Sequence, residues 1–237
     1  MNEKLLKELV DKLSKAYGES LVSVVLYGSA ATGEHHAKFS DYNVLCVLTQ
    51  LRARELSASQ ELFRWWREQG SPSPLLLTEQ ELATSTDCFA IEFTDIKNQH
   101  RLLYGRDVLS GLAIDTSFYR AQVEHDLRAK LLRLRQKCAG ILGDAGLLRR
   151  LLLDSVSTFC VLFRHALALH GVEAAPKKRE VVAAAQQQFG INPAPFEQLL
   201  DVREERIKPR DLDAASLLGG YLEGISKVID AVDRLEK

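Results

Sequence analysis

The chain has 237 residues, enough for one large domain or two small ones. Its 31 Lys and Arg residues nearly balance 32 Asp and Glu residues, and the net charge of −1 gives no reason to expect a nucleic acid as partner. The N-terminal sequence MNEKLLKELV is too charged for a secretory signal peptide, and no run of about 18 apolar residues predicts a membrane span. We therefore expect a protein that is not attached to a membrane.

The four cysteines lie far apart in the sequence, at Cys46, Cys88, Cys138 and Cys160. Neither a CxxC pair nor a histidine at zinc-ligand spacing accompanies them. A buried free cysteine behaves as a small hydrophobic residue, so we expect reduced thiols in the protein core. Reduced thiols suit a cytoplasmic location.

The first half of the chain mixes helical and strand patterns. Residues 2–17 repeat leucines on one helical face, VSVVLY at 22–27 is rich in β-branched residues, and YNVLCVL at 42–48 is apolar on both faces, as in a central strand. In CFAIEFTDI, apolar and polar residues alternate, which favours a strand. The predicted strands are 22–27, 42–48, 74–78, 88–96 and a short edge strand within 100–109; the predicted helices are 2–17, 55–69 and a short one after a capping box at Thr78 and Glu81.

From Phe118 onward the apolar residues follow a helical period only. Leu127, Leu131 and Leu134 have heptad-like spacing, and four further helical segments follow, near 148–170, 177–189, 193–206 and 212–235. The pattern predicts an α+β fold: a small mixed-sheet domain at residues 1–117, followed by an all-α helical bundle at residues 118–237.

A glycine-serine pair follows the first predicted strand, in LYGSAATGEHHAKFSDYNVLCVL at residues 26–48. A strand that runs into Gly28 and Ser29 and then a helical turn reaching to near His36 would direct several backbone N–H groups to one point. Such a point favours phosphate, through hydrogen bonds and through the positive end of the turn. The absence of a side chain at Gly28 would let a phosphate approach the backbone, and Ser29 would add a hydroxyl.

Acidic and amide side chains follow at the next strand. Asp41 and Asn43 are two residues apart at its start, so we expect both side chains on one face. Glu92 occupies a polar position of the predicted strand 88–96. Carboxylates on neighbouring strands beside a phosphate-binding turn are a common way to hold Mg²⁺ against a triphosphate. The sequence therefore predicts a site for a nucleoside triphosphate and Mg²⁺.

These residues resemble a known superfamily. The segment VVLYGSAATG…SDYNVLCVL is similar to the Gly-Ser…Asp-x-Asp signature of the polymerase-beta-type nucleotidyltransferases, and IEFTDIKNQHRLLYG resembles the segment that carries their third carboxylate. A small sheet domain followed by a helical bundle is similar to the kanamycin nucleotidyltransferase and the minimal nucleotidyltransferases. The motif resemblance covers about residues 22–105.

The resemblance implies a role for each matching residue. Gly28 and Ser29 would bind the phosphates of ATP or another nucleoside triphosphate. Asp41 would ligate Mg²⁺, Asn43 would contact the nucleotide at the place of the second metal-binding carboxylate, and Glu92 would be the third carboxylate, as base or metal ligand. The implied reaction transfers a nucleoside monophosphate to an acceptor hydroxyl, with pyrophosphate as leaving group.

Asn43 departs from the superfamily pattern. Its amide oxygen can ligate Mg²⁺ but supplies no negative charge. Two hypotheses follow: a transferase of weak or unusual activity, or a catalytically silent nucleotide sensor or interaction module of the same fold. The acceptor, the base preference and a homodimer formed through the bundle stay open.

Other charged residues have simpler interpretations. We expect Lys97, Arg101 and Arg106 to protect an edge strand more than to bind phosphate, and Asp154 to pair with Arg150 four residues earlier more than to act as a base. His35 and His36 are interpreted as exposed loop residues. A third alternative, a nuclease-like bundle, depends on Arg164 and His170, which do not share one helical face.

Overall fold

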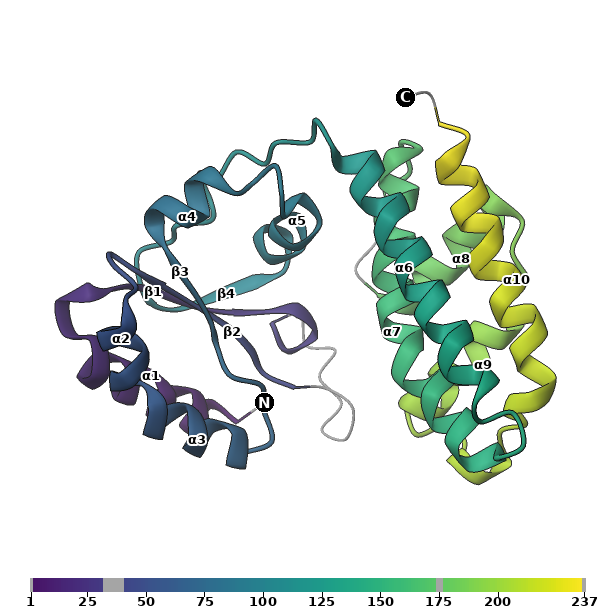
Figure 1. Ribbon diagram of the computed structural model, residues 1–237, viewed down its shortest axis with the longest axis horizontal. Helices are drawn as coiled ribbons and strands as arrows, with labels where there is room; N and C mark the ends of the chain where they lie inside the picture. Colours follow the sequence, from purple (N-terminus) through teal and green to yellow (C-terminus); the bar gives the residue numbers. More distant parts are fainter. Residues whose placement is uncertain (1, 32–40, 174–176, 236–237) are drawn as a thin grey trace. The chain divides into compact units, whose positions relative to one another are not determined.

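The computed structural model describes residues 2–31, 41–173 and 177–235. The chain divides into two compact units, Met1–Ser117 and Phe118–Lys237, which we call the N-terminal and C-terminal units. The N-terminal unit combines a sheet with helices and the C-terminal unit is helical, so the fold class is α+β (Figure 1).

A four-stranded mixed sheet is the centre of the N-terminal unit, as far as the structure describes it. The strands are β1 (Leu21–Tyr27), β2 (Asn43–Leu48), β3 (Leu75–Thr78) and β4 (His100–Gly105). Their order is β3-β2-β1-β4; β1 is antiparallel to β2 and β4, and β2 is parallel to β3. The apolar strand β2 is therefore internal, as its sequence predicted, and β4 is an edge strand.

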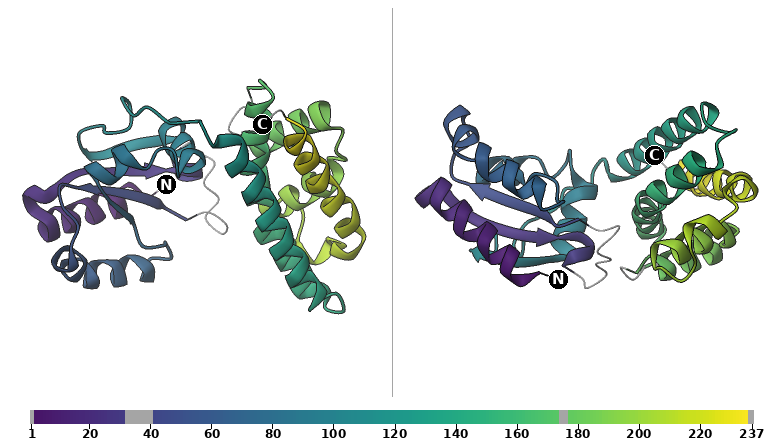
Figure 2. Two further views of the ribbon diagram at one scale, coloured as in Figure 1. Left: turned by 45° about the horizontal axis from the view of Figure 1, so that its top comes forward. Right: turned by 90° about the horizontal axis from the view of Figure 1, so that it is seen from below.

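Helices cover both faces of this sheet, as Figures 1 and 2 show. On one face, α1 and α3 pack Leu9 and Trp66 against Val24, Val44 and other side chains of β1 and β2. On the opposite face, α4 and α5 pack Leu82, Phe93 and Ile96 against Val25, Leu45 and Val47. The helices of this unit are α1 (Glu3–Tyr17), α2 (Ala53–Ala58), α3 (Gln60–Glu68), α4 (Glu79–Thr84) and α5 (Ala90–Asn98).

The strand predicted at residues 88–96 is wrong, because this segment forms helix α5. The buried residues of α5 include Ala90, Phe93 and Ile96, which are three apart, as on one face of a helix. Phe89 is 50% exposed, although the alternating pattern placed it on the buried side with Phe93. Cys88 is exposed too, so the prediction of a core thiol is wrong for this one cysteine, while the other three are buried.

Two local predictions concern the helices around the sheet. Thr78 and Glu81 form the expected capping box at the start of α4, with the Glu81 backbone N–H donating to Thr78 Oγ1 over 3.1 Å. The single helix predicted at 55–69 is interrupted at Ser59, which separates α2 from α3 and donates from its hydroxyl to the Leu56 carbonyl over 3.0 Å.

The C-terminal unit is a bundle in which α7 supplies the largest share of the core. Its buried residues include Leu152, Phe159 and Phe163, and Phe196 of α9 packs against Phe163 at a centroid distance of 5.3 Å. By length and composition α7 could cross a membrane, but 56% of its most apolar window is buried in the unit, as in the core helix of a soluble protein. The helices described in this unit are α6 (Tyr119–Ala139), α7 (Ala145–Leu169), α8 (Lys178–Phe189), α9 (Ala194–Arg203) and α10 (Ala214–Asp233).

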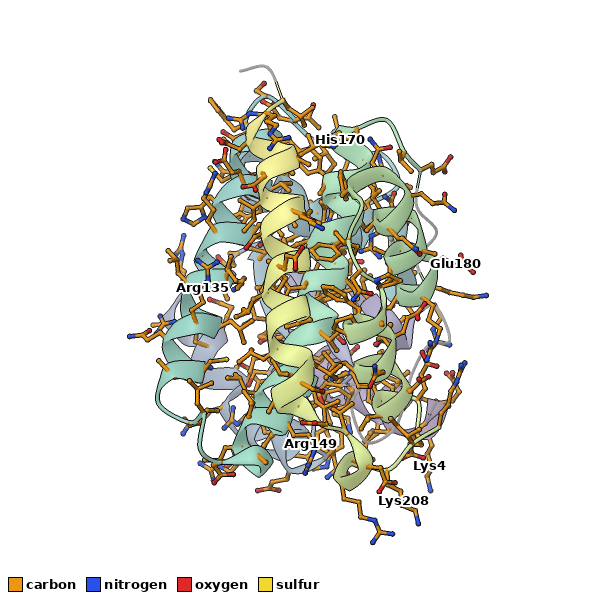
Figure 3. All side chains as sticks on the ribbon, turned by 90° about the vertical axis from the view of Figure 1, so that its right-hand side faces the viewer. Lys4, Arg135, Arg149, His170, Glu180 and Lys208 are labelled. Carbon is orange, nitrogen blue, oxygen red and sulfur yellow. The ribbon has the colours of Figure 1, made fainter. Side chains whose placement is uncertain are left out.

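Charged side chains cover the outside of the bundle. Figure 3 shows His170 near one end of it and Arg149 and Lys208 near the other. Arg149 ties α7 to the segment before α10, since its Nε donates to the carbonyl of Leu212 over 3.1 Å. This hydrogen bond gives Arg149 a structural role within the unit.

Candidate functional site in the N-terminal unit

A tight turn ends strand β1 at the position where the sequence predicted a phosphate-binding loop. Gly28 to Ala30 form one turn of 3-10 helix, and Gly28 has φ +74°, a left-handed conformation that suits glycine. The Gly28 N–H donates to the Gln99 carbonyl over 3.0 Å, and the Ala31 N–H donates to the Gly28 carbonyl over 2.9 Å. Any backbone N–H that this turn offers to a phosphate must therefore come from Ser29 or Ala30. The predicted continuation towards His36 lies outside the described residues.

Strand β2 begins beside this turn. Asn43 is its first residue and pairs with Tyr27, the last residue of β1. The amide nitrogen Nδ2 of Asn43 lies 3.6 Å from the position that a Cβ atom at residue 28 would take. The structure thus brings Asn43 next to Gly28, although 14 residues separate Gly28 from the start of β2 in sequence.

Tyr42 is the anchor that orients this end of β2. Its side chain is buried, its ring centroid lies 6.2 Å from that of Trp66, and its hydroxyl accepts a hydrogen bond from the Asn2 backbone over 2.8 Å. Alternate residues of an extended chain face opposite sides, so Asp41 and Asn43 point away from the core that holds Tyr42. Asp41 is exposed and Asn43 is half-buried.

Glu92 does not occupy the position on which its predicted role depended. It lies in the first turn of α5, on the exposed side of the helix, and not on a strand beside β2. None of the residues of β1, β2, β3 and β4 is an Asp or a Glu. Within the described ranges, no group of three or more His, Cys, Asp or Glu side chains could hold a metal ion.

The positions of Asp41, Asn43 and Glu92 determine how many Mg²⁺ ions this end of the sheet could hold. A site for two metal ions needs several carboxylates to offset four positive charges, and this end of the sheet offers Asp41 among the described residues. One Mg²⁺ needs fewer protein ligands, because it usually keeps water molecules and takes further oxygens from substrate phosphates. The described residues at this end of the sheet therefore fit one metal ion shared with the phosphates and do not fit a two-metal centre.

The cationic residues in the last turn of α5 and after it have partners within the unit. Lys97 Nζ donates to the Leu112 carbonyl over 2.7 Å, and the Arg106 side chain pairs with Glu79. Arg101 binds both carboxylate oxygens of Glu3, at 2.9 and 3.2 Å, and these hydrogen bonds lower the pKa of that carboxyl. Arg101 lies on the edge strand β4 and Arg106 directly follows it, but Lys97 lies in helix α5, so the expected protection of an edge strand does not apply to Lys97.

His100 and Asp107 form a second polar pair at β4. His100 pairs with Tyr27 in the sheet, and its Nε2 atom lies 3.6 Å from Asp107 Oδ1. The Leu109 backbone N–H donates to the same carboxylate over 2.9 Å, and this hydrogen bond is the largest cause of the lowered pKa of Asp107. The Asp107 carboxylate thus fixes the segment after β4.

Comparison with known proteins identifies the fold. No protein-family model matches the chain, and no curated protein matches its sequence. Among solved structures, spectinomycin adenyltransferase AAD(9) from Enterococcus faecialis, solved with ATP and spectinomycin, matches with a TM-score of 0.60 and 14% sequence identity. The match covers 94% of this chain and 99% of that chain. The chain has the nucleotidyltransferase fold.

A second solved structure is similar over a smaller part of the chain. It is a toxin-antitoxin complex with AMP-PNP, 20% identical, and the match covers 43% of this chain and 74% of that one with a TM-score of 0.31. A TM-score of 0.31 is too low to support a conclusion about the fold of this chain. The resemblance drawn from the Gly-Ser and Asp-x-Asn motif is confirmed at the level of the nucleotidyltransferase fold by the first match.

Candidate residues in the bundle have local partners. Arg150 Nε lies 3.9 Å from Asp154 Oδ2, which agrees with the expected pair four residues apart. His170 lies just beyond the end of α7, and its Nδ1 is 2.8 Å from the Ala166 carbonyl. Arg164 lies within α7 and His170 lies beyond its end, so the two do not share a helical face as the nuclease-like alternative requires.

Sequence reasoning missed two residues that position the turn and strand β2. Gln99 acts through its backbone carbonyl, and no side-chain pattern predicts such a contact. Tyr42 could have been found, since an aromatic residue between two polar ones at the start of an apolar strand indicates an alternation of buried and exposed positions.

Proposed function

We propose that the protein binds a nucleoside triphosphate in its N-terminal unit. The phosphates would lie on the turn at Gly28 and Ser29, beside Asn43 and Asp41. The observation that carries this proposal is the position of the Asn43 amide next to the left-handed Gly28 in a nucleotidyltransferase fold. The ATP present in the spectinomycin adenyltransferase structure supports a nucleotide as ligand of this fold.

Asp41 would hold one Mg²⁺ ion together with the phosphates. Such an ion offsets phosphate charge and orients the triphosphate. Glu92 takes no part in this proposal, because the strand position that its role required belongs to helix α5. With Asn43 in place of a carboxylate, the chain would hold a nucleotide without transferring it efficiently, as a sensor or an interaction module.

Nucleotide transfer is the second candidate function. It is favoured by the acceptor, spectinomycin, bound with ATP in a structure that matches 94% of this chain. Under this alternative, the protein would transfer a nucleoside monophosphate to an unknown acceptor hydroxyl with weak activity. Both candidates suit a cytoplasmic protein, where nucleotide is abundant and the free thiols stay reduced.

Isothermal titration with ATP, with Mg²⁺ and with EDTA, tests the proposal. We expect ATP to bind to the native protein and more weakly to Asp41→Asn in the presence of Mg²⁺. Asp11→Asn is the matched control, because it removes the same charge from an exposed position of α1. Absence of binding at millimolar ATP would contradict the proposal.

Incubation with ATP labelled at its α-phosphate separates the two candidates. A silent binder leaves the label in ATP with any acceptor offered, whereas a transferase moves it to protein, RNA or an aminoglycoside. Transfer that persists in Asp41→Asn would show that the chemistry belongs to another site.

A further inference from the structure

We infer that the side-chain amide of Asn43 donates a hydrogen bond directly to a phosphate oxygen, so that position 43 helps to hold the triphosphate without a second metal ion. The inference rests on the proposed function and specifies how the phosphates are held. It follows from the amide that this chain places at the turn, where the resemblance implied a second metal-binding carboxylate.

The geometry provides the first step. Asn43 Nδ2, and not the amide oxygen, is the atom placed 3.6 Å from the Cβ position of residue 28. An amide nitrogen carries two N–H donors. The donor end of Asn43 therefore lies at the surface of the turn that would receive the phosphates.

The surroundings of the amide provide the second step. Within the described part of the chain, no hydrogen bond occupies the Asn43 side chain, although it is half-buried. A partly buried polar group gains most from a ligand that satisfies it. The Gly28 carbonyl, an acceptor of the turn, is already bonded, since it accepts from the Ala31 N–H over 2.9 Å.

Charge provides the third step. A carboxylate at position 43 would repel the triphosphate unless a metal ion stood between them. An amide at the same position removes this repulsion and replaces it with an attraction that needs no metal ion. The four strands carry no Asp or Glu. No acidic side chain of the sheet therefore needs a second metal ion to offset its charge.

Titration with ATP in EDTA and in Mg²⁺ tests this inference on the native protein and Asn43→Asp. For the native protein we expect tighter binding in Mg²⁺, because Asp41 and the phosphates share one ion, and binding that remains measurable in EDTA because the Asn43 amide needs no metal ion. For Asn43→Asp we expect the Kd in EDTA to rise about tenfold to a hundredfold, the effect of a lost hydrogen bond to a charged group, and to recover in part with Mg²⁺.

Two further variants keep the test decisive. Asn192→Asp adds the same charge at an exposed position of the C-terminal unit and should leave the Kd unchanged in both conditions. Asn43→Ala removes the donor without adding charge, so it should weaken binding by a similar factor in EDTA and in Mg²⁺. Circular dichroism and tryptophan fluorescence confirm that each variant is folded.

The outcomes separate the inference from the proposed function. If Asn43→Asp binds ATP in EDTA as tightly as native protein does, the inference is wrong and the proposed function stands. If Asn43→Ala is folded and binds ATP as tightly as native protein in EDTA, the amide does not contact phosphate. If native protein binds ATP in neither condition, both are wrong.

Discussion

Two residues shape the turn after β1, Gly28 through its backbone conformation and Asn43 through its side chain. Gly28 adopts φ +74°, and its N–H bonds to the Gln99 carbonyl, so its conformation links the turn to the segment before β4. Asn43 contributes a side chain to the same place from the neighbouring strand. A substitution at Gly28 therefore changes the backbone of the turn, whereas a substitution at Asn43 changes the side-chain group beside it.

Replacement of Gly28 by alanine should destabilise the N-terminal unit by roughly 1–2 kcal/mol, the cost of a left-handed conformation for a residue with a Cβ. The new methyl group would lie in ordinary contact with Asn43 Nδ2, at 3.6 Å, so the cost comes from the backbone and not from a clash. We also expect weaker ATP binding, because the methyl group covers the turn. Urea denaturation followed by tryptophan fluorescence measures the first effect, and titration measures the second.

Gly111→Ala is the control for this prediction, since a Cβ there meets no atom within 4 Å and its φ lies outside the left-handed range. Equal stability of Gly28→Ala and native protein would show that the turn adopts another conformation in solution.

The parts of this site differed in how well the sequence could predict them. Gly28 and Asn43 border apolar strands separated by a short segment, so their proximity follows from pairing between neighbouring strands. Glu92 could not be placed, because its predicted position depended on the type of a whole element. The hydrogen bond to the Gln99 carbonyl has no sequence signal, since every residue carries the same backbone groups.

At the scale of elements, the segment 88–96 shows where local patterns become ambiguous. Three apolar residues at alternate positions, Phe89, Ile91 and Phe93, are compatible with a strand, but the segment also places Ala90, Phe93 and Ile96 three apart. The helical choice buries Phe93 and Ile96 against Val25 and Leu45 of the sheet. Tertiary packing therefore decided between two local options that the sequence alone left nearly equal.

Helix α10 offers a matched pair of glycines for a test of packing. Gly219 is exposed, and a Cβ there would meet no atom within 4 Å, so Gly219→Ala should stabilise the protein by about 0.5–1 kcal/mol through helix propensity. A Cβ at Gly224 would lie 2.8 Å from Cε2 of the fully buried Phe196. Gly224→Ala should therefore destabilise the protein by about 1–3 kcal/mol, because the ring has no room to move.

Thermal unfolding followed by circular dichroism checks the opposite signs of these two effects. The two positions share one helix and one substitution, so a difference between them isolates the contact with Phe196. If both variants stabilise the protein, α9 and α10 are packed less closely than the structure describes.

At the scale of the whole molecule, the chain contains two units with separate cores. The sheet and its helices bury one set of side chains, and the bundle buries another around α7. Both tryptophans of the chain, Trp65 and Trp66, belong to the N-terminal unit, and Trp66 is fully buried. Tryptophan fluorescence therefore reports on the N-terminal unit, whereas far-ultraviolet circular dichroism is dominated by the long helices of the bundle.

This separation predicts how a ligand should change unfolding. A ligand that binds the folded N-terminal unit at one hundred times its Kd stabilises that unit by about 2.7 kcal/mol, which corresponds to a rise in Tm on the order of 10 °C. We expect ATP to raise the midpoint of the fluorescence transition by this order and to move the circular dichroism transition less. Asp11→Asn should retain the shift, and Gly28→Ala should reduce it. If ATP instead moves the circular dichroism transition alone, the nucleotide binds to the bundle, and the assignment of the site to the turn at Gly28 is wrong.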